Sequence, residues 1–403
     1  MALLSVADAQ ALVLKDAQAL PAVDAPLAAA HGRVLAADLA ALRTQPPAAV
    51  SAMDGYAVRA ADIATIPARL RLIGEVAAGH PFDRPVGAGE AARIFTGGVL
   101  PPGADTVVIQ EITAREGDTV VVQKPSAKGR HIRPEGLDFK AGAALLAAGR
   151  RLTARDLALA AAMNHATVPV HRRPKVAVLA TGDELVMPGT TPGHGQIVYS
   201  NGFALMAQVA AEGAEVIDLG IAPDQLDATI AAVARARELG ADLLVTTGGA
   251  SVGEHDLVQK AFAAHGMALS FWKVALRPGR PLMHGRLGAM EVLGLPGNPV
   301  SAFVCAVLFA VPLLRRLAGR RDLGPDTESA VLGCDLPAND ERTDYMRAEL
   351  SARPDGGLVA TPYPVQDSSM LVPLANAGCL VIREPYAPAA AAGRPCTIVK
   401  LAF

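Results

Sequence analysis

The spacing of apolar and polar positions changes character along the chain. Residues from Ser5 to Leu20 have the spacing of an amphipathic helix, with Ser5 as its N-cap. Residues 44–140 instead form short β-like segments separated by glycine and proline. Examples are Leu70–Val76, Ala92–Phe95, Thr106–Gln110 and Thr119–Gln123. A second helix is expected to open at Thr153, and the basic segment 171–174 is typical of a linker.

Beyond this linker, apolar strands alternate with helices. The expected strands are residues 175–180, 214–219, 242–246, 268–274 and 291–295, and the expected helices are 202–211, 224–239, 255–264 and 299–317. The alternation predicts a doubly wound α/β domain with a parallel sheet over 173–321. Short strands with proline and glycine turns return over 322–403, which predicts a small C-terminal β-barrel or sandwich. Residues 1–172 form the N-terminal α+β region, with a β-rich subdomain at about 44–140.

Composition narrows the class of protein. A chain of 403 residues is too long for one core. A formal net charge of −2 gives no reason to expect a nucleic-acid partner. The four cysteines lack metal-ligand spacing, and the first residues do not have the pattern of a signal peptide, so a cytoplasmic protein is expected. The most apolar stretch, Ala302–Leu314, is shorter than a bilayer span and predicts a buried helix with no membrane role.

Candidate chemistry follows four of the predicted strands. The segments are 181–185, 247–256, 276–281 and 296–301. In a doubly wound sheet, ligands bind at the carboxyl ends of the strands, so all four are expected on one rim. Glycines in the second segment let backbone N–H groups approach an anion near a helix N-terminus. These are Gly248, Gly249 and Gly253, accompanied by Ser251 and Asp256, and the alternative is an ordinary glycine-rich loop.

Positive charge and a hydroxyl are expected on the same rim. Arg277 and Arg280 have planar guanidinium groups that suit phosphate or another tetrahedral oxyanion, and the rigid Pro278-Gly279 turn favours this over a solvated turn. Asn298-Pro299 is a helix start that needs no function. Ser301 would direct its hydroxyl into the same helix N-terminus, where a binding role and a structural role are equally supported.

Negative charge on this rim predicts a metal. Glu184, Asp224 and Asp256 would crowd an anion site unless a hard cation such as Mg²⁺ is present. Helix capping explains Asp224 equally well. The residues by themselves therefore predict metal-assisted chemistry on a phosphorylated or nucleotide-like ligand.

Five motifs occurring in order are more specific than any one of them. They are residues 51–57 (SAMDGYA), 94–98 (IFTGG), 181–185 (TGDEL), the 248–256 loop and 295–301 (LPGNPVS). From Ser5 to about Val399 the chain resembles the molybdopterin molybdenumtransferase family, which includes the C-terminal domain of gephyrin. The resemblance implies an enzyme that takes adenylylated molybdopterin and molybdate, hydrolyses the adenylate with Mg²⁺ and releases active cofactor and AMP. It also implies a homodimer whose cleft lies between the α/β domain of one subunit and the β-rich domain of the other.

The resemblance also assigns individual residues. Positions tied to activity in the family match Asp54, Thr96, Asp138, Glu184, Asp224, Asp256, Lys273, Pro296 and Pro299, with Glu184 and Asp256 as the expected metal ligands. The molybdate pocket matches Arg277, Arg280, Ser301, Arg347 and one of Ser368 or Ser369. Lysines are usual in the family where Arg277 and Arg280 stand, so positive charge is kept while the geometry differs.

Other functions share parts of this pattern. Molybdopterin adenylyltransferase and the CinA-like nucleotide enzymes have a similar sheet and glycine loop, but neither is expected to have the Asp54 segment or the last β domain. A gephyrin-like scaffold is a non-enzymatic alternative, and it could lose the rim carboxylates that this chain keeps at Glu184 and Asp256. The expected partners are a second copy of the chain and, transiently, a molybdopterin adenylyltransferase or a molybdoenzyme chaperone.

Overall fold

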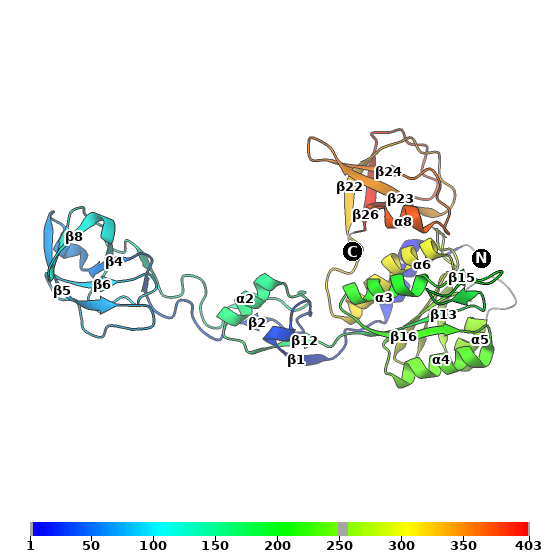
Figure 1. Cartoon of the computed structure of the whole chain (residues 1–403), viewed down its shortest axis with the longest axis horizontal. Coiled ribbons are helices and arrows are strands. Elements are labelled where there is room, and N and C mark those ends of the chain that lie inside the picture. Colours follow the sequence, from blue (N-terminus) through cyan, green and yellow to red (C-terminus); the bar gives the residue numbers. More distant parts are fainter. Residues whose placement is uncertain (1–2, 249–256, 402–403) are drawn as a thin grey trace.

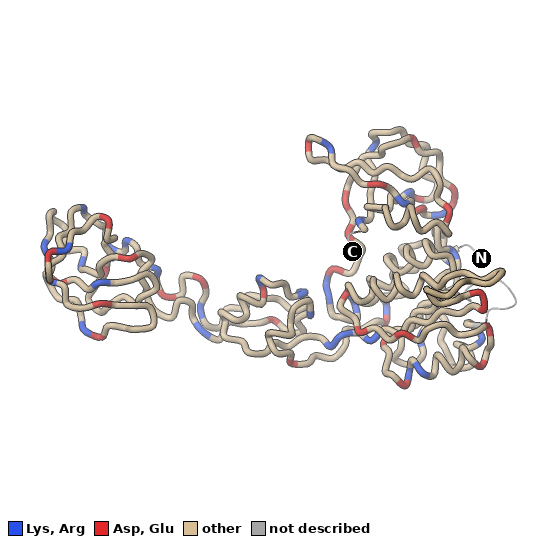
Figure 2. The backbone as a smooth tube through the Cα atoms, in the orientation of Figure 1, with Lys and Arg blue, Asp and Glu red and all other residues tan. Residues whose placement is uncertain are grey.

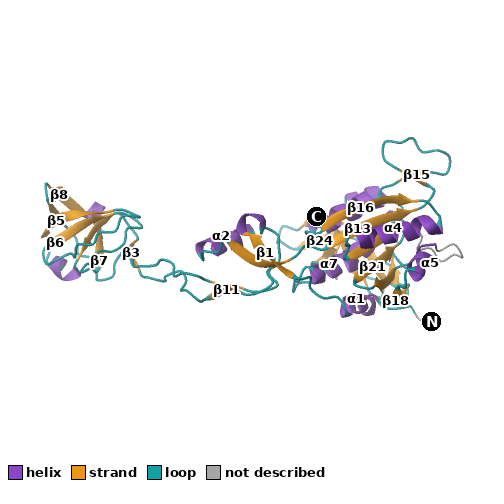
Figure 3. Cartoon of the chain, turned by 90° about the horizontal axis from the view of Figure 1, so that it is seen from below, coloured by secondary structure: helices purple, strands orange, loops and turns teal. Residues whose placement is uncertain are grey.

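The computed structural model describes residues 3–248 and 257–401, and these form an elongated molecule (Figure 1). An α/β domain with a β-barrel packed beside it occupies one end, and an arm of two smaller units extends from it to the other end. Helices are concentrated in the α/β domain, whereas the arm consists mainly of strands and loops (Figure 3).

The chain begins in the α/β domain before it enters the arm. Helix α1 spans Val6–Lys15, and the Ser5 hydroxyl caps it by accepting from the Asp8 N–H at 3.1 Å, which confirms the predicted N-cap. Strand β1 (Ala22–Pro26) then leads into the arm and pairs antiparallel with β12 (Thr167–His171), which leads out. The arm is therefore an insertion whose two ends lie side by side.

The unit nearest the α/β domain is small. It contains a short 3₁₀ helix η1 (Leu27–Ala29), the pair β2 (Leu39–Ala40) and β11 (Ala144–Leu146), and helix α2 (Ala154–Ala162). Helix α2 begins at the predicted position because Thr153 and Asp156 form a reciprocal capping box. Buried apolar side chains, including Leu35 and Met163, form its core.

The distal unit of the arm is a six-stranded sheet with strand order β7-β4-β6-β5-β9-β8. The strands are β4 (Gly55–Val58), β5 (Ala68–Val76), β6 (Glu90–Ile94), β7 (Thr106–Ile109), β8 (Thr113–Glu116) and β9 (Thr119–Val122), with the added pair β3 (Val50–Ser51) and β10 (Ile132–Arg133) and the 3₁₀ helices η2 (Ala60–Ile63) and η3 (Gln110–Ile112). The four strands expected in this region are all present to within two residues at each end.

The α/β domain has a six-stranded sheet in the order β16-β13-β17-β21-β20-β18. These strands are β13 (Lys175–Thr181), β16 (Glu215–Ala222), β17 (Leu243–Thr247), β18 (Ala268–Trp272), β20 (Met283–Leu287) and β21 (Met290–Leu295). Alternate residues of β13 enter opposite cores. Val176 and Val178 pack with α1 (Val6–Lys15), α3 (Asn201–Ala211) and the helix from Pro299, whereas Ala177 and Leu179 pack with α4 (Leu226–Glu238) and α5 (Leu257–Ala264).

One strand of this sheet corrects the sequence prediction. Strands β16, β13, β17 and β21 are parallel as expected, but β20 was not predicted and runs antiparallel to both of its neighbours, so the sheet is mixed. Its polar residues conceal it in the sequence. His284 and Arg286 both contact the buried Glu291 carboxylate at 3.1 Å, which compensates the burial of that charge.

The most apolar helix is interrupted by one turn of π-helix. It consists of α6 (Pro299–Cys305), the π segment Ala306–Ala310 and α7 (Val311–Leu317). Pro312 has no N–H, and the Leu308 carbonyl instead accepts a hydrogen bond from the Gln10 amide of α1 at 2.9 Å. This helix is long and apolar enough to cross a membrane, but 89% of its apolar window is buried inside the protein, which confirms the predicted core helix.

The C-terminal domain is a closed barrel, as predicted. Its strands are β22 (Thr327–Leu332), β23 (Thr343–Ala352), β24 (Leu358–Pro362), β25 (Cys379–Arg383) and β26 (Pro395–Lys400), and helix α8 spans Leu371–Ala375. The barrel closes because β23 pairs with both β24 and β25. Strand β19 (Leu276–Arg277), which comes from the α/β domain, pairs with the start of β23.

Candidate active site

A cleft of about 1000 Å³ lies at the carboxyl ends of β13, β17 and β21. Its lining includes Thr181, Gly182 and Glu184 after β13, Thr247 and Gly248 at the end of β17, and Pro296, Asn298, Pro299 and Ser301 after β21. Three of the four segments predicted on this rim therefore meet there. The fourth contributes only Pro281 to the lining, while Ser369 and Leu371 of the C-terminal domain form another part of the wall.

The floor of the cleft brings backbones into close contact. Gly248 has φ +88°, and a Cβ at this position would lie 2.3 Å from the Thr181 carbonyl oxygen. The Asn201 amide connects the end of β17 to the segment after β21. It donates to Thr247 Oγ1 at 3.0 Å and to the Gly297 carbonyl at 2.7 Å. The cleft therefore has a rigid base where a ligand can approach the main chain.

Two of the predicted carboxylates differ in what they contact. Glu184 is exposed in the cleft, and a Cβ at Gly182 would lie 2.4 Å from its Oε2. Asp224 and Asp183 instead exchange hydrogen bonds, with the N–H of each donating to the carboxylate of the other at 3.0 and 3.4 Å. The Asp224 carboxylate therefore stabilises the turn after β16 while it also lines the cleft.

The remaining predicted residues of the glycine loop are outside the described part of the chain. They are Gly249, Ser251, Gly253 and Asp256. Within residues 3–248 and 257–401, no three carboxylate, histidine or cysteine side chains gather as a metal site. A donor set of one or two carboxylates still fits Mg²⁺, because this ion usually keeps several waters and takes further oxygens from substrate phosphates.

The two serines of the C-terminal domain have different contacts. The Ser368 carbonyl accepts from the Val300 N–H at 3.0 Å, and its hydroxyl accepts from the Asn298 amide at 2.9 Å. Ser368 therefore satisfies the N-terminus of α6. The Ser369 hydroxyl donates to Asp367 at 2.6 Å and lines the cleft. Ser301 is buried and lines the cleft as well.

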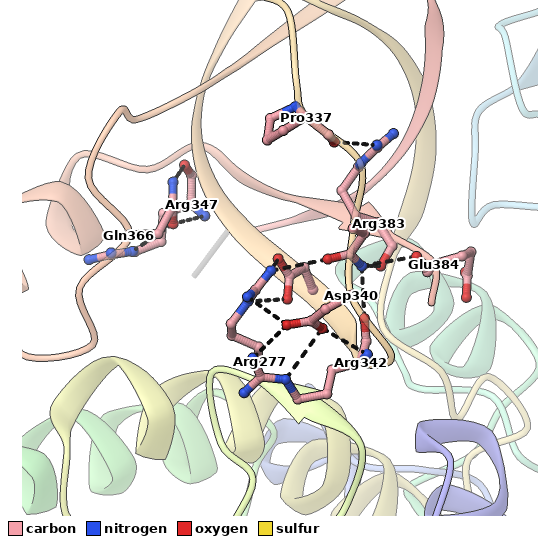
Figure 4. A network of polar contacts seen from close by, with 10 residues as sticks. Arg277, Pro337, Asp340, Arg342, Arg347, Gln366, Arg383 and Glu384 are labelled. Carbon is pink, nitrogen blue, oxygen red and sulfur yellow. Dashed lines mark hydrogen bonds and ion pairs between the residues drawn. The ribbon is translucent and has the colours of Figure 1, made fainter. Parts of the chain in front are cut away.

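The predicted cationic residues are distributed differently from the expectation. Arg277 forms ion pairs with Asp340 and Asp344 (Figure 4). Arg347 is 1% exposed and donates to carbonyls of the loop at 365–370. Lys273 has φ +80°, and its ammonium lies 4.4 Å from the centre of the Trp272 ring. None of these three side chains lines the cleft among the described residues.

The predicted residues of the arm lie far from this cleft within one chain (Figure 1). The Asp54 carboxylate accepts from both the N–H and the hydroxyl of Thr96 at 2.8 Å. The backbone hydrogen bond from Thr96, its hydroxyl and the nearby Arg93 hold the pKa of Asp54 below its usual value. Asp138 is exposed on the chain between the two arm units. One subunit therefore does not bring Asp54, Thr96 or Asp138 to the cleft.

Sequence reasoning missed two polar residues of the cleft, Asn201 and Tyr199, and gave no separate role to the Thr181 hydroxyl within the predicted 181–185 segment. Asn201 bridges two strand ends, and the hydroxyls of Thr181 and Tyr199 are buried without a hydrogen-bond partner in the described structure. Burial raises the pKa of Tyr199 to about 12, which keeps this phenol protonated. A signal was available in the sequence, because Tyr199 and Ser200 stand between the apolar pair Ile197-Val198 and helix α3, which begins at Asn201.

A second, smaller cavity of about 330 Å³ lies where Arg151 of the arm, the end of α3, α7 and the barrel meet. Arg315 and Arg320 both contact the buried Glu212 carboxylate there, at 2.9 and 2.8 Å. Positive and negative side chains are interspersed along the arm, the α/β domain and the barrel (Figure 2). Because the charged side chains of the small cavity already pair with one another, the cleft of about 1000 Å³ is the better candidate for a binding site.

Comparison with known proteins agrees with this arrangement. Three family descriptions match consecutive parts of the chain: "MoeA N-terminal region (domain I and II)" over residues 4–164, "Probable molybdopterin binding domain" over 177–316 and "MoeA C-terminal region (domain IV)" over 329–401. A molybdopterin molybdenumtransferase of Haemophilus influenzae is 34% identical and covers 92% of this chain and 91% of its own. Molybdopterin molybdenumtransferase 2 of Mycobacterium tuberculosis is 36% identical over 86% of this chain and 87% of its own.

A solved structure has the same architecture over the full length. The molybdopterin biosynthesis MoeA protein from Pyrococcus horikosii has a TM-score of 0.87, is 30% identical and covers 100% of both chains. Because the matches to these relatives and to this structure extend over nearly all of each chain, the protein belongs to the molybdopterin molybdenumtransferase (MoeA) family.

Proposed function

We propose that the chain inserts molybdenum from molybdate into adenylylated molybdopterin and releases AMP in a Mg²⁺-dependent reaction. The names of its curated relatives support a transferase of molybdenum cofactor biosynthesis. The observation that carries the proposal is the convergence of three strand ends, the close main-chain approach at Gly248 and the exposed Glu184 in one cleft. Such a cleft suits a ligand with phosphate groups and a metal.

Particular residues have particular roles in this proposal. Glu184 and Asp256 are the metal ligands, and the metal, when bound, offsets phosphate charge and polarises the bond that breaks. The backbone near Gly248 approaches the phosphates, and Asn201 keeps the strand ends in register. Ser301 and Ser369 supply hydroxyls to the wall of the cleft.

The same proposal requires a homodimer. Asp54, with Thr96 bound to it, belongs to the distal unit of the arm, and within one chain this unit lies far from the α/β domain that holds Glu184 (Figure 1). The arm of a second copy, related by a two-fold axis, would bring Asp54 to each cleft and create two equivalent shared sites. A cytoplasmic location and transient contact with a molybdopterin adenylyltransferase or a molybdoenzyme chaperone complete the proposal.

The direct test is chemical. Purified protein is supplied with adenylylated molybdopterin, molybdate and limiting Mg²⁺, and both AMP release and reconstitution of a molybdoenzyme are followed. Glu184→Gln should reduce AMP release by at least about 100-fold, because a metal ligand is lost where phosphate charge must be offset. Glu238→Gln, an exposed substitution of the same type on α4, is the matched control. Wild-type release by Glu184→Gln at limiting Mg²⁺ would exclude the metal role.

The shared site is tested by complementation. Asp54→Asn and Glu184→Gln, each with its own affinity tag, should be inactive as homodimers. Mixed dimers purified through both tags should recover part of the activity, because one of their two clefts receives both intact carboxylates. Verified mixed dimers without recovery, alongside active wild-type dimers treated identically, would show that the site is not shared in this way.

A further inference from the structure

Arg93 lies near the end of the distal sheet that carries Asp54 and Thr96. Asp54 directly precedes β4, and Thr96 follows β6 by two residues. These strands are adjacent and antiparallel, with Arg93 of β6 opposite Tyr56 of β4. Arg93 therefore lies close to the two segments that hold the Asp54 carboxylate and its hydrogen-bond donors.

The Arg93 guanidinium is held on several sides. It lies over two aromatic rings, 5.1 Å from the centre of Tyr56 and 4.9 Å from the centre of Phe95. Its Nη1 donates to the Gly55 carbonyl at 3.3 Å, and its Nη2 donates to the side-chain oxygen of Gln110 at 2.6 Å. A planar guanidinium can stack on rings and donate in its own plane at the same time. Arg93 thus connects β4, the segment after β6 and the start of η3.

The same three segments hold Asp54. The N–H and the hydroxyl of Thr96 both donate to its carboxylate at 2.8 Å, and the Gln110 N–H donates to its carbonyl at 3.2 Å. Each of these residues, or its neighbour in the sequence, is also in contact with Arg93. Loss of the Arg93 side chain should therefore loosen both amide contacts of Asp54.

Arg93 also affects the charge of this carboxylate. The backbone hydrogen bond from Thr96 is the largest cause of the lowered pKa of Asp54, and the Thr96 hydroxyl and the positive charge of Arg93 act in the same direction. The side chains that hold Arg93, those of Tyr56, Phe95 and Gln110, are uncharged at neutral pH, so they do not cancel its charge.

This positive charge matters where Asp54 is expected to act. The cleft already contains the exposed carboxylates of Glu184 and Asp224. A third carboxylate brought among them by the arm of a second copy is opposed by like-charge repulsion. A guanidinium that arrives on the same rigid sheet end as Asp54 offsets part of that repulsion.

We propose that Arg93 is a positioning residue for Asp54, which holds this carboxylate at the end of the distal sheet and offsets its charge when the arm of one copy meets the cleft of another. The second part rests on the proposed function, because it requires the shared cleft. The first part rests only on contacts within one chain.

Two measurements on the full chain test the positioning role. Hydrogen exchange of the Thr96 and Gln110 amides reports how firmly Asp54 is held, and NMR titration of its carboxylate reports the field of Arg93. Arg93→Gln should speed exchange of both amides at least about tenfold and raise the pKa of Asp54, since the stacked contacts and the charge are both lost. Arg93→Lys should speed exchange in the same way but leave this pKa near the wild-type value, because an ammonium keeps the charge without the planar fork.

Gln110→Glu gives the opposite combination. The new carboxylate keeps an acceptor for Arg93 while cancelling its charge, so exchange of the Thr96 amide should stay at the wild-type rate and the pKa of Asp54 should rise. This exposed substitution remains informative if Arg93→Gln does not fold. Arg69→Gln, which breaks an exposed ion pair on β5 of the same sheet, is the control and should change neither measurement.

Wild-type exchange of both amides in folded Arg93→Gln would overturn the positioning role, and a pKa of Asp54 that is unchanged in Arg93→Gln and Gln110→Glu would overturn the charge role. In the AMP-release assay, Arg93→Gln should lower kcat at least about tenfold with little change in KM, because Asp54 is misplaced while the cleft that binds the substrate is intact. If Asp54→Asn releases AMP at the wild-type rate, the shared site of the proposed function is wrong, while the exchange rates still decide whether Arg93 holds Asp54.

Discussion

Substitution of Gly248 by alanine tests the floor of the cleft. A side chain at φ +88° costs about 1–2 kcal/mol by itself. The new Cβ would also lie 2.3 Å from the Thr181 carbonyl oxygen, far inside normal contact, and relief requires the ends of β13 and β17 to separate. Overpacking of this kind adds about 1–3 kcal/mol. The expected loss in free energy of unfolding is therefore about 2–5 kcal/mol.

Gly240→Ala is the matched control. Gly240 has φ +71° in the same domain, directly after α4, and a Cβ at this position would have no atom within 4 Å. It should lose only the conformational part, about 1–2 kcal/mol. The two variants thus separate crowding at the cleft from the cost of the left-handed backbone.

The assay uses the one tryptophan of the chain. Trp272 lies on β18, so its fluorescence during urea unfolding follows the α/β domain without a contribution from tryptophans elsewhere. With a slope of about 2 kcal/mol per M, Gly248→Ala should reach its midpoint roughly 1 M below Gly240→Ala. Equal midpoints for the two variants would refute the close packing of Gly248 on Thr181.

Three further substitutions have expected outcomes. Thr96→Val should raise the pKa of Asp54 only part of the way, because the larger contribution, the Thr96 N–H, remains. The lowered pKa stabilises the folded state at pH values above the ordinary pKa of Asp, and this stabilisation is lost as the pH falls through the lowered pKa. NMR titration of the Asp54 carboxylate should therefore give a higher midpoint in Thr96→Val than in the wild type. An unchanged midpoint would contradict the contact between Asp54 and the Thr96 hydroxyl. Asn201→Ala should lower the free energy of unfolding, measured by Trp272 fluorescence, by about 1–3 kcal/mol, because two hydrogen bonds are lost. An unchanged free energy of unfolding would mean that the Asn201 amide does not connect the two strand ends. Thr153→Ala should destabilise α2 by about 1 kcal/mol, because it removes the N-cap of this helix. Amide hydrogen exchange in α2 should become faster, while the Trp272 unfolding transition should not shift. Unchanged hydrogen exchange in α2 would argue against the capping box.

Local pattern predicted most of the elements because each follows from a local cause. Ser5 and Thr153 cap the helices that begin after them, and the apolar segments of the α/β domain are strands because both faces of the sheet are covered. Strand β20 could not be found in this way, since His284 and Arg286 are buried only through a contact with Glu291 on the neighbouring strand. Such compensation depends on tertiary pairing.

The position of the cleft could also be predicted from the order of strands in the sequence, with one exception. Segments after β13, β17 and β21 meet because the carboxyl ends of adjacent parallel strands meet. The segment at 276–281 does not behave as a simple strand end, because Leu276 and Arg277 pair with β23 of another domain. The carboxylates that occupy Arg277 lie at 340 and 344 in the sequence, and no local pattern around Arg277 indicates them.

The position of α1 has a consequence for synthesis of the chain. Its Val6, Ala9 and Val13 are buried in the α/β core, and Gln10 bonds to Leu308, 298 positions later. At about 5–20 residues per second, roughly 15–60 s pass between the synthesis of these two residues. The arm can close within that time because its two ends, β1 and β12, already pair with each other. Helix α1 has fewer residues than an isolated helix needs to be stable in water. It therefore stays unfolded until its partner Leu308 has been made, when just over three quarters of the chain is complete.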